Sequence, residues 1–208
     1  MAVNRKIAFI DLDTRHIETT PVPDDWRQKF IGGRGVGTYL ACKHSQPGCD
    51  ALAPGNTMVI SAGLLAGTLS SPSAATCLTT KSPLTGFLEC ALLPGPFAAE
   101  MRWAGFDHLV ITGCAEQPVS LFIHNGSIKV IAAGNLKGYG VARTCASVRK
   151  ALGDQDLKVL AIGPAGENLV KIAAILHEDR SASRTGVGAV MGSKNLKAVA
   201  VRGTGRGP

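Results

Sequence analysis

The sequence has few aromatic residues and no long apolar run, and both absences exclude classes of protein. Aromatic residues make up 5% of the 208 residues, too few for the stacking platforms of proteins that bind single-stranded nucleic acid. No apolar run approaches the roughly 18 residues that a membrane-spanning helix needs. The N-terminal stretch MAVNRKIAFIDLD lacks the apolar core of a secretion signal, because charged residues interrupt it after a few positions. We therefore expect a cytoplasmic protein with no membrane span and no nucleic-acid partner.

Cysteine ligand motifs and catalytic histidine motifs are also missing. The 6 cysteines include no Cys-x-x-Cys pair, and their spacings match no pattern of zinc or iron–sulfur ligands. We interpret most of them as small buried apolar side chains, and without a secretion signal we expect no disulfide framework. The 5 histidines show no His-x-x-x-His spacing, and no Gly-x-Ser-x-Gly turn is present. The sequence thus offers no catalytic residue and no metal ligand of its own.

The chain is rich in positive charge and in glycine. Its 22 basic residues outnumber its 15 acidic residues and give a net charge of +7, which favours an anionic partner: nucleic acid, which the few aromatic residues and dispersed charge disfavour, a phosphorylated cofactor or an acidic protein. Two glycine-rich segments, GGRGVG (32–37) and GVGAVMGSKN (186–195), look like nucleotide loops. The first follows a predicted helix and has the wrong glycine spacing for a Rossmann loop, and the second lacks the Gly-Lys-Ser/Thr of a Walker A loop. We interpret the second as a tight turn before a closing strand.

The order of the expected elements occurs twice along the chain. Each half opens with a predicted hairpin, the second of which has Asn125-Gly126 at its turn. A helix, a buried strand, a glycine-rich loop and a further strand follow in both halves, and VISAGLLAG and LAIGPAGEN fall at corresponding places. This order predicts one α+β domain over residues 1–208, built from duplicated sheet-and-helix motifs. The repeats span about 4–82 and 118–203.

Two arginines in the segment EDRSASRTG form a candidate anion site. Arg180 and Arg184 lie four positions apart, so in a helix they would share a face. In a loop, backbone N–H groups and both guanidinium groups could surround a phosphate. The alternative is a solvated arginine pair whose partners are Glu178 and Asp179. The residues alone leave both interpretations open.

Several stretches taken together resemble one family. FIGGRGVGTYL and ISAGLLAGTLS come first, and four longer stretches follow in the same order as in the family: TKSPLTGF (80–87), WAGFDHLVITGCAEQPV (103–119), IGPAGENLVKIAAI (162–175) and GVGAVMGSKNLKAVAVRG (186–203). They are similar to the N-terminal domain of the tungsten-containing aldehyde ferredoxin oxidoreductase family. The resemblance covers nearly the whole chain and implies the duplicated α+β fold of that domain.

The resemblance also implies an activity and cofactors. Family members oxidise aldehydes to carboxylic acids at tungsten, or sometimes molybdenum, which the dithiolenes of two pterins hold. A magnesium ion lies between the pterin phosphates, and electrons leave through a [4Fe–4S] cluster to ferredoxin. The N-terminal domain is the base on which the bis-pterin cofactor lies, whereas later domains, absent from these 208 residues, carry the cluster cysteines and much of the substrate pocket. We therefore expect the remaining family domains or a partner subunit as partners, with ferredoxin reached indirectly. We also expect an oligomer, because the isolated chain would expose apolar area.

The cofactor contacts of the family match four residues of this sequence. The segment RSASRTG corresponds to the family's Arg-Ala-Ala-Gly-Arg-Gly-Gly, so Arg180, Ala182 and Arg184 match. Gly95 matches a glycine in the turn that follows the TKSPLTG region. The resemblance implies that these four residues bind the pterin cofactor.

Other contact positions depart from the family. Ala75 stands where the family has an arginine that contacts pterin phosphate, and Leu92 replaces an asparagine whose carbonyl helps to hold magnesium. Pro94 removes an N–H donor, and Ser183 replaces a glycine.

Two hypotheses follow from these matches and departures. The first is a pterin-cofactor base domain or subunit of a tungsten or molybdenum oxidoreductase. The alternative is a degenerate, non-catalytic paralogue that has lost the cofactor and acts as a structural or assembly partner. Under both hypotheses we expect no turnover by the isolated chain, because it has no cluster ligands.

Overall fold

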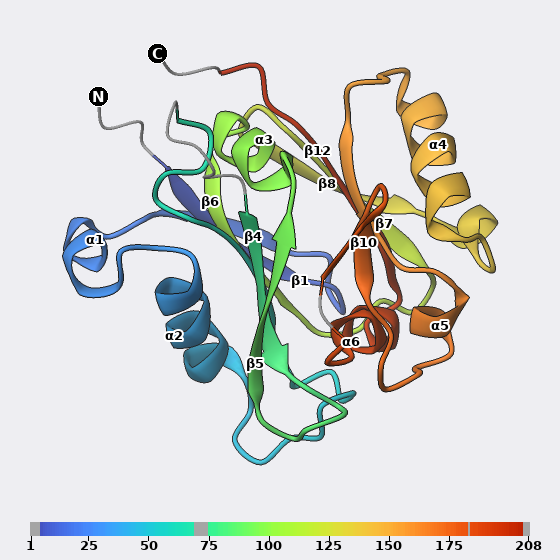
Figure 1. Cartoon of the computed structure of the whole chain (residues 1–208), viewed down its shortest axis with the longest axis horizontal. Coiled ribbons are helices and arrows are strands. Elements are labelled where there is room, and N and C mark those ends of the chain that lie inside the picture. The colour runs from blue at the N-terminus through green and yellow to red at the C-terminus, as the bar shows by residue number, and fades with distance from the viewer. Residues whose placement is uncertain (1–4, 69–74, 183, 206–208) are drawn as a thin grey trace.

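Two six-stranded mixed sheets form the framework of the described residues (Figure 1). The computed structural model describes residues 5–68, 75–182 and 184–205. The first sheet has the order β2-β1-β6-β3-β4-β5 and the second β8-β7-β12-β9-β10-β11. Within these ranges, each sheet has one parallel pair, β1 with β6 and β7 with β12, and its other neighbours are antiparallel.

The elements have the following bounds. The strands of the first sheet are β1 (Lys6–Asp11), β2 (Ile17–Pro21), β3 (Met58–Ala62), β4 (Ala75–Lys81), β5 (Leu88–Pro94) and β6 (Phe106–Thr112). Those of the second are β7 (Val119–His124), β8 (Ser127–Ala132), β9 (Lys158–Ala161), β10 (Ile175–His177), β11 (Arg180–Ala182) and β12 (Leu196–Arg202). The helices are α1 (Asp24–Phe30), α2 (Arg34–His44), α3 (Phe97–Trp103), α4 (Val141–Leu152), α5 (Pro164–Glu167) and α6 (Val187–Ser193), with a 3-10 turn at Gly134–Leu136.

The two sheets have equivalent strand orders, which shows the duplication in the structure. Pairing β1 with β7, and so on in sequence to β6 with β12, converts the order of one sheet into that of the other. Helices α2 and α4 follow the opening hairpins, and α3 and α6 precede the last strands. The predicted duplicated α+β fold is confirmed. The first sheet extends beyond residue 82 to Thr112, because β5 and β6, which α3 connects, complete it. Linear order alone did not show that β6 inserts between β1 and β3.

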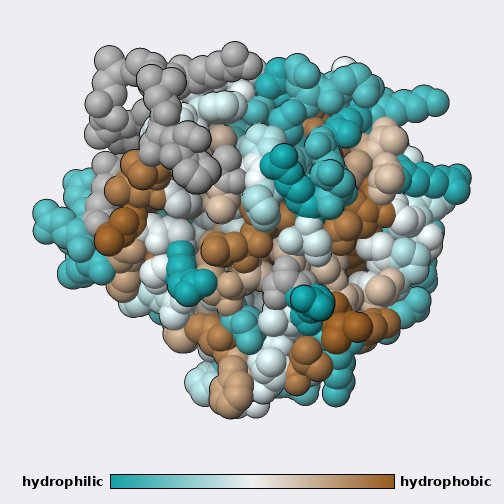
Figure 2. All heavy atoms as spheres, in the orientation of Figure 1, coloured by the Kyte–Doolittle hydropathy of each residue, from teal (hydrophilic) through white to brown (hydrophobic). Residues whose placement is uncertain are grey.

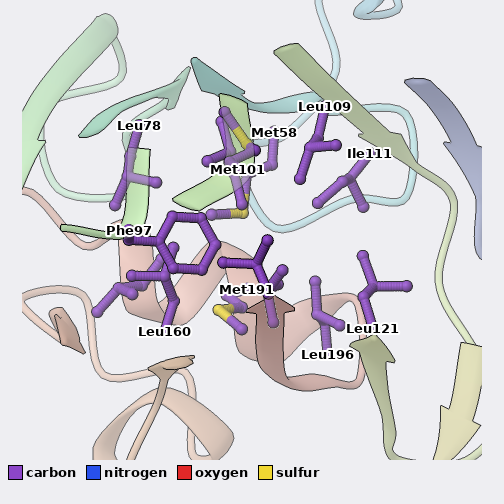
Figure 3. Packing of buried hydrophobic residues seen from close by; sticks show 14 of the residues in the cluster. Met58, Leu78, Phe97, Met101, Leu109, Ile111, Leu121, Leu160, Met191 and Leu196 are labelled. Carbon is purple, nitrogen blue, oxygen red and sulfur yellow. The ribbon is translucent and has the colours of Figure 1, made fainter. Parts of the chain in front are cut away.

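Two helices lie between the sheets, and two others cover their outer faces. Helix α2 packs its Val36 and Leu40 on the outer face of the first sheet, and α4 packs its Cys145 and Val148 on the outer face of the second. Helices α3 and α6 lie between the sheets, where one cluster of buried apolar residues takes side chains from both (Figure 3). The labelled residues of this cluster are Met58, Leu78, Phe97, Met101, Leu109, Ile111, Leu121, Leu160, Met191 and Leu196.

Each parallel strand pair carries an irregularity at the same place. The register skips Asp107 in the pairing of β6 with β1 and Lys197 in the pairing of β12 with β7. Both skipped residues are charged and form ion pairs: Asp107 with Arg102 at 3.2 Å, and Lys197 with Glu167. The duplication thus repeats a local defect as well as the strand order, although the sign of the charge is reversed. Such irregularities commonly redirect a side chain rather than weaken a sheet at random.

Glycine positions account for several element ends. The β7–β8 hairpin turns at Asn125 and Gly126, both with positive φ, 42° and 84°, as the sequence predicted for a tight hairpin turn. Helix α4 ends at Gly153 in the left-handed conformation, with φ 68°. In the described parts of the chain, no helix combines the length and the apolar character needed to cross a bilayer.

The glycine-rich stretch that we expected to be a turn is helix α6, so that expectation was wrong. A Cβ on Gly188 would lie 2.5 Å from the carbonyl oxygen of Ala174, and one on Gly192 would collide with the carbonyl of Gly166. Glycine weakens an isolated helix by up to about 1 kcal/mol per residue. Here its missing side chain lets α6 approach the backbone of α5 and its neighbours, and this packing outweighs the low helix propensity.

Cys77 and Cys90 form a disulfide between β4 and β5, a bond that the expectation of no disulfide framework did not foresee. The strand register pairs Thr79 with Cys90 and Cys77 with Leu92, so the two cysteines are diagonal neighbours whose Cα atoms lie 6.2 Å apart. A separation of 13 residues matches no motif, and only the hairpin register brings the sulfurs together. Burial of most cysteines was also wrong, because Cys42 is exposed and only Cys77 and Cys145 are fully buried.

Replacing Gly192 by alanine is expected to destabilise the fold. The added methyl group collides with the Gly166 carbonyl, and overpacking of this kind costs about 1–3 kcal/mol. Gly134→Ala is the matched control, because a Cβ there meets nothing within 4 Å. Urea unfolding followed by circular dichroism measures both variants. Equal stability of the two variants would contradict the close packing of α5 on α6.

Thiol counting tests the disulfide. Air-oxidised protein, denatured without reductant, should react with alkylating agent at the four free cysteines, Cys42, Cys49, Cys114 and Cys145. After reduction, all 6 cysteines should react. Closing a loop of this length stabilises a fold by about 3 kcal/mol, so Cys90→Ser should lower the urea midpoint. Mass spectrometry reads the labelling, and six labelled thiols before reduction would show that the bond does not form.

Candidate anion-binding site

The candidate site lies where the two sheets meet through their edge strands. Strand β5 is an edge of the first sheet and β11 an edge of the second, and the two strands contact each other (Figure 1). They are also equivalent strands in the duplication. This contact brings Gly95, which follows β5, next to Arg180, which begins β11. Two of the residues predicted from the sequence are therefore neighbours in space.

Gly95 lies close against His177 and Arg180 at the end of β5. Its backbone has φ 127°, a conformation that residues with a side chain rarely adopt. A Cβ built on Gly95 would lie 2.8 Å from Cδ2 of His177 and 3.5 Å from Nη1 of Arg180. Any larger residue would fill the space between the imidazole and the guanidinium. The requirement for glycine thus comes from both the backbone and the neighbours.

Arg180 and Arg184 carry charges that no carboxylate of the described residues balances. Both side chains are exposed, and among the described residues neither forms an ion pair. Glu178, which the sequence offered as a partner, instead pairs with Arg149 at 2.8 Å. Residues Arg180–Ala182 form a strand, so the two arginines do not share a helix face. Unpaired guanidinium groups are well suited to oxyanions, which they bind through forked N–H donors.

The backbone around Arg184 is held by contacts with the first sheet and with α6. Ser82 donates a hydrogen bond from its hydroxyl to the carbonyl oxygen of Thr185, at 2.6 Å. Ala182 is fully buried in the core between the sheets, so only its backbone could face a ligand. Ser183, which departs from the family's glycine, lies outside the described residues. These contacts fix the course of the chain on either side of the two arginines.

The side of the site that β4 and β5 supply carries no charge. Ala75, where the resemblance led us to look for an arginine, pairs with Pro94 across the two strands. Pro94 has no N–H to donate, and the Leu92 side chain is 52% exposed. All cationic groups of the site therefore come from the second sheet and the segment after it.

His177 belongs to the site and was missed in the sequence. The residue is 1% exposed, and its Nδ1 lies 3.0 Å from the carbonyl oxygen of Val159. Its Nε2 is buried without a hydrogen-bond partner among the described residues. Burial lowers the pKa of His177, because a low-dielectric environment disfavours the charged imidazolium. Nothing in the stretch KIAAILH distinguishes this histidine from an ordinary strand residue, so only the structure reveals it.

The residues present fit one phosphate group better than two. A phosphate needs N–H donors and positive charge, and the guanidinium groups of Arg180 and Arg184 carry both. Ala75, Leu92 and Pro94 supply only backbone atoms. Among the described residues, no group of three or more His, Cys, Asp or Glu side chains is placed to hold a metal ion. A cavity of about 290 Å³ lies elsewhere, against Lys197 and Glu167, and none of the four candidate residues lines it.

These features define a duplicated α+β domain with a candidate anion-binding site at the meeting of its two sheets. Residues 7–203 match the family described as "Aldehyde ferredoxin oxidoreductase, N-terminal domain". The chain belongs to this family.

The relatives of the chain include enzymes of different specificity. It is 44% identical over 196 residues to the tungsten-containing aldehyde ferredoxin oxidoreductase of Pyrococcus furiosus, covering 94% of this chain and 32% of that protein. It is 33% identical over 220 residues to the WOR-like subunit of aliphatic sulfonate oxidoreductase from the same organism, covering 98% of this chain and 35% of that protein. The chain spans about a third of the length of these curated relatives.

A solved structure shows the same fold. A chain of the active-site complex BamBC of benzoyl coenzyme A reductase, in complex with 1,5-dienoyl-CoA, aligns with a TM-score of 0.94 at 35% identity. The alignment covers 97% of this chain and 31% of the other. The α+β fold is thus shared with a region of a larger enzyme.

Replacing Gly95 by alanine is expected to disturb the site. The methyl group would meet His177 at 2.8 Å, and together with the unfavourable φ this should cost about 1–3 kcal/mol. Gly86→Ala is the matched control, because it also has positive φ (74°) but a Cβ there meets nothing within 4 Å. Thermal unfolding compares the variants. If Gly86→Ala costs as much as Gly95→Ala, the backbone alone requires glycine and the close neighbours do not matter.

Proposed function

We propose that this chain is the pterin-cofactor base of a tungsten- or molybdenum-containing oxidoreductase, and that Arg180 holds a pterin phosphate. The observation that carries this proposal is the guanidinium of Arg180, which has no ion-pair partner among the described residues and lies beside Gly95 at the meeting of the two sheets. The tungsten-containing relatives support the identity of the metal. In the family, the bound metal–pterin group supplies the oxidation of an aldehyde to a carboxylic acid, and its electrons pass through a [4Fe–4S] cluster outside this chain to ferredoxin.

In this proposal, the residues of this chain bind and orient the pterin cofactor. Arg180 and Arg184 neutralise phosphate charge and donate N–H groups, and Gly95 lets the end of β5 lie close to the Arg180 guanidinium. A magnesium ion between two pterin phosphates would find only backbone carbonyl oxygens in the segment from Leu92 to Gly95, whose side chains carry no oxygen. The second phosphate would therefore depend on residues outside this domain, because Ala75 offers it no charge.

We assign the choice of substrate to the rest of the enzyme. The relatives that share this region are named for aldehydes, for aliphatic sulfonates and for benzoyl coenzyme A. A region common to enzymes with such different substrates is suited to carry the shared cofactor rather than to select among them.

A surface of apolar side chains favours association with further domains or a partner subunit. Phe87 is 76% exposed at the tip of the β4–β5 hairpin, and Ile172 is 58% exposed after α5. The two segments adjoin, because a Cβ on Gly186 would touch both Pro83 and Lys171. Figure 2 shows apolar residues at several places on this face of the molecule. Exposed apolar area of this kind marks contact surfaces, and we propose that the remaining two thirds of the family architecture cover it. Ferredoxin would be reached only through them.

The second candidate function is that of a structural partner without cofactor. It is favoured by one observation, the pairing of Ala75 with Pro94, which leaves half of the expected phosphate site uncharged. Such a paralogue would keep the fold and the apolar contact surface but would hold no pterin.

Measuring the metal and pterin content of the natural assembly tests the first proposal. The chain, purified together with its natural partners, should contain tungsten or molybdenum and pterin. Arg180→Met should reduce the pterin content at limiting cofactor, because losing a charge-assisted hydrogen bond weakens binding by about 1.5–3 kcal/mol, roughly 10- to 100-fold. Arg143→Met is the control, because Arg143 is exposed on α4 and stacks on Tyr139, away from the site.

The metal and pterin contents decide between the two candidate functions. An assembly of the unaltered chain with neither metal nor pterin would overturn the first proposal and favour the structural partner. Metal and pterin in the assembly, with a loss specific to Arg180→Met, would support the cofactor base.

A further inference from the structure

We propose that His177 is a positioning residue for Arg180. Its Nε2 would accept a hydrogen bond from one guanidinium N–H and so orient the guanidinium toward the phosphate. This inference rests on the proposed anion-binding function and adds a residue that neither the sequence motifs nor the resemblance indicated. It assigns a role to a buried nitrogen that otherwise has none.

The β10–β11 hairpin places the two side chains next to each other. His177 and Arg180 are direct partners in the antiparallel register, and side chains of such partners lie on the same face of a sheet, about 5 Å apart at Cβ. Nε2 of His177 and Nη1 of Arg180 each lie 3.5 Å from the point where a Gly95 Cβ would be. Both nitrogens therefore lie beside Gly95, and the proposed hydrogen bond requires the Arg180 side chain to turn toward Nε2 of His177.

The hydrogen bond on the other side of the ring fixes the tautomer. Nδ1 of His177 lies 3.0 Å from the carbonyl oxygen of Val159, and a carbonyl oxygen can only accept. The ring proton of the neutral imidazole is therefore on Nδ1, which leaves a lone pair on Nε2. That nitrogen is buried without a partner among the described residues. An unsatisfied buried acceptor is unfavourable, so a donor brought within reach is bound.

The chemistry of a guanidinium suits this arrangement. Arginine has five N–H donors in a rigid plane and no acceptor, so one N–H given to His177 leaves the outward edge of the fork for an oxyanion. Arg180 has no carboxylate among the described residues that competes for this role. Phe97 packs against the imidazole edge, with ring centroids 6.4 Å apart, and restrains the ring from turning.

The surroundings keep the imidazole neutral and thus able to accept. Burial is the largest influence on the pKa of His177 and lowers it, and the positive charges of Lys158 on β9 and Arg149 on α4 act in the same direction. The Val159 carbonyl and Glu178 oppose them, but the net direction is down. Protonation at Nε2 would replace the acceptor by a donor and would place a positive charge beside the Arg180 guanidinium.

A double-mutant cycle separates positioning from a structural role. The 208-residue chain is titrated with inorganic pyrophosphate by calorimetry, as wild type, His177→Phe, Arg180→Met and the double variant. Phenylalanine keeps the ring but removes the acceptor. We expect His177→Phe to weaken pyrophosphate binding about tenfold, and to have no further effect once Arg180 is methionine. His177→Gln, whose amide oxygen can replace the acceptor, should stay within about threefold of wild type.

The outcomes separate this inference from the proposed function. If wild type does not bind pyrophosphate, or if Arg180→Met binds as wild type does, the anion site itself fails and the positioning role fails with it. If Arg180 matters but His177→Phe binds like wild type, only the positioning role is overturned. Equal weakening by His177→Phe with and without Arg180 would likewise reduce His177 to a structural residue.

A measurement on the unaltered His177 covers the case in which His177→Phe fails to fold. The ¹⁵N chemical shift of Nε2 reports whether the lone pair takes a hydrogen bond. Addition of pyrophosphate should move this shift in wild type in the direction of hydrogen bonding, and should leave it unchanged in Arg180→Met. No movement in wild type, although pyrophosphate binds, would overturn the proposal.

Discussion

The contact between the edge strands β5 and β11 is the constraint on which the rest of the structure depends. Edge strands present unpaired backbone groups and must be covered or paired. Here two sheets with the same strand order place equivalent edges together, with α3 and α6 buried between the sheets and one apolar cluster drawing on both. The contact closes the core, and it also brings together segments that are far apart in the sequence. Gly95 and Arg180 become neighbours only because of it.

The charges at this contact are unequal although the strands are equivalent. The second sheet contributes Arg180, with Arg184 close behind it in the chain, and the first sheet contributes Ala75 and Pro94, which carry no charge. Other arginines of the fold that are buried or half-buried are balanced, as Arg102 is by Asp107 and Arg202 by Glu100. Arg180 is exposed and, like the exposed Arg34 and Arg143, has no carboxylate partner among the described residues, but it differs from those two in lying beside Gly95 and His177. Part of the net positive charge of the chain therefore lies at the candidate site, where it would attract an anion.

The sequence predicted the family and the duplication, because motifs and residue order are local information, and the motifs also named Gly95, Arg180, Ala182 and Arg184 as candidate site residues. It did not predict the strand order, since β6 inserts between strands that precede it by many residues. It missed helix α6, whose glycines are unfavourable until they pack on the α5 backbone, and the Cys77–Cys90 disulfide, which depends on hairpin register. The sequence did not indicate His177 for the same reason. Its proposed role depends on contacts with Val159 and Gly95, which lie far from it in the sequence.

The central claim is that an anion binds where the two sheets meet, between Gly95 and Arg180. A crystal structure of the chain grown with pyrophosphate tests it most directly. We predict density for a phosphoryl group within hydrogen-bond distance of the Arg180 guanidinium, above the α-carbon of Gly95. Density for the anion only in the cavity beside Lys197, or an Arg180 side chain turned away from Gly95 with no anion near it, would contradict the claim.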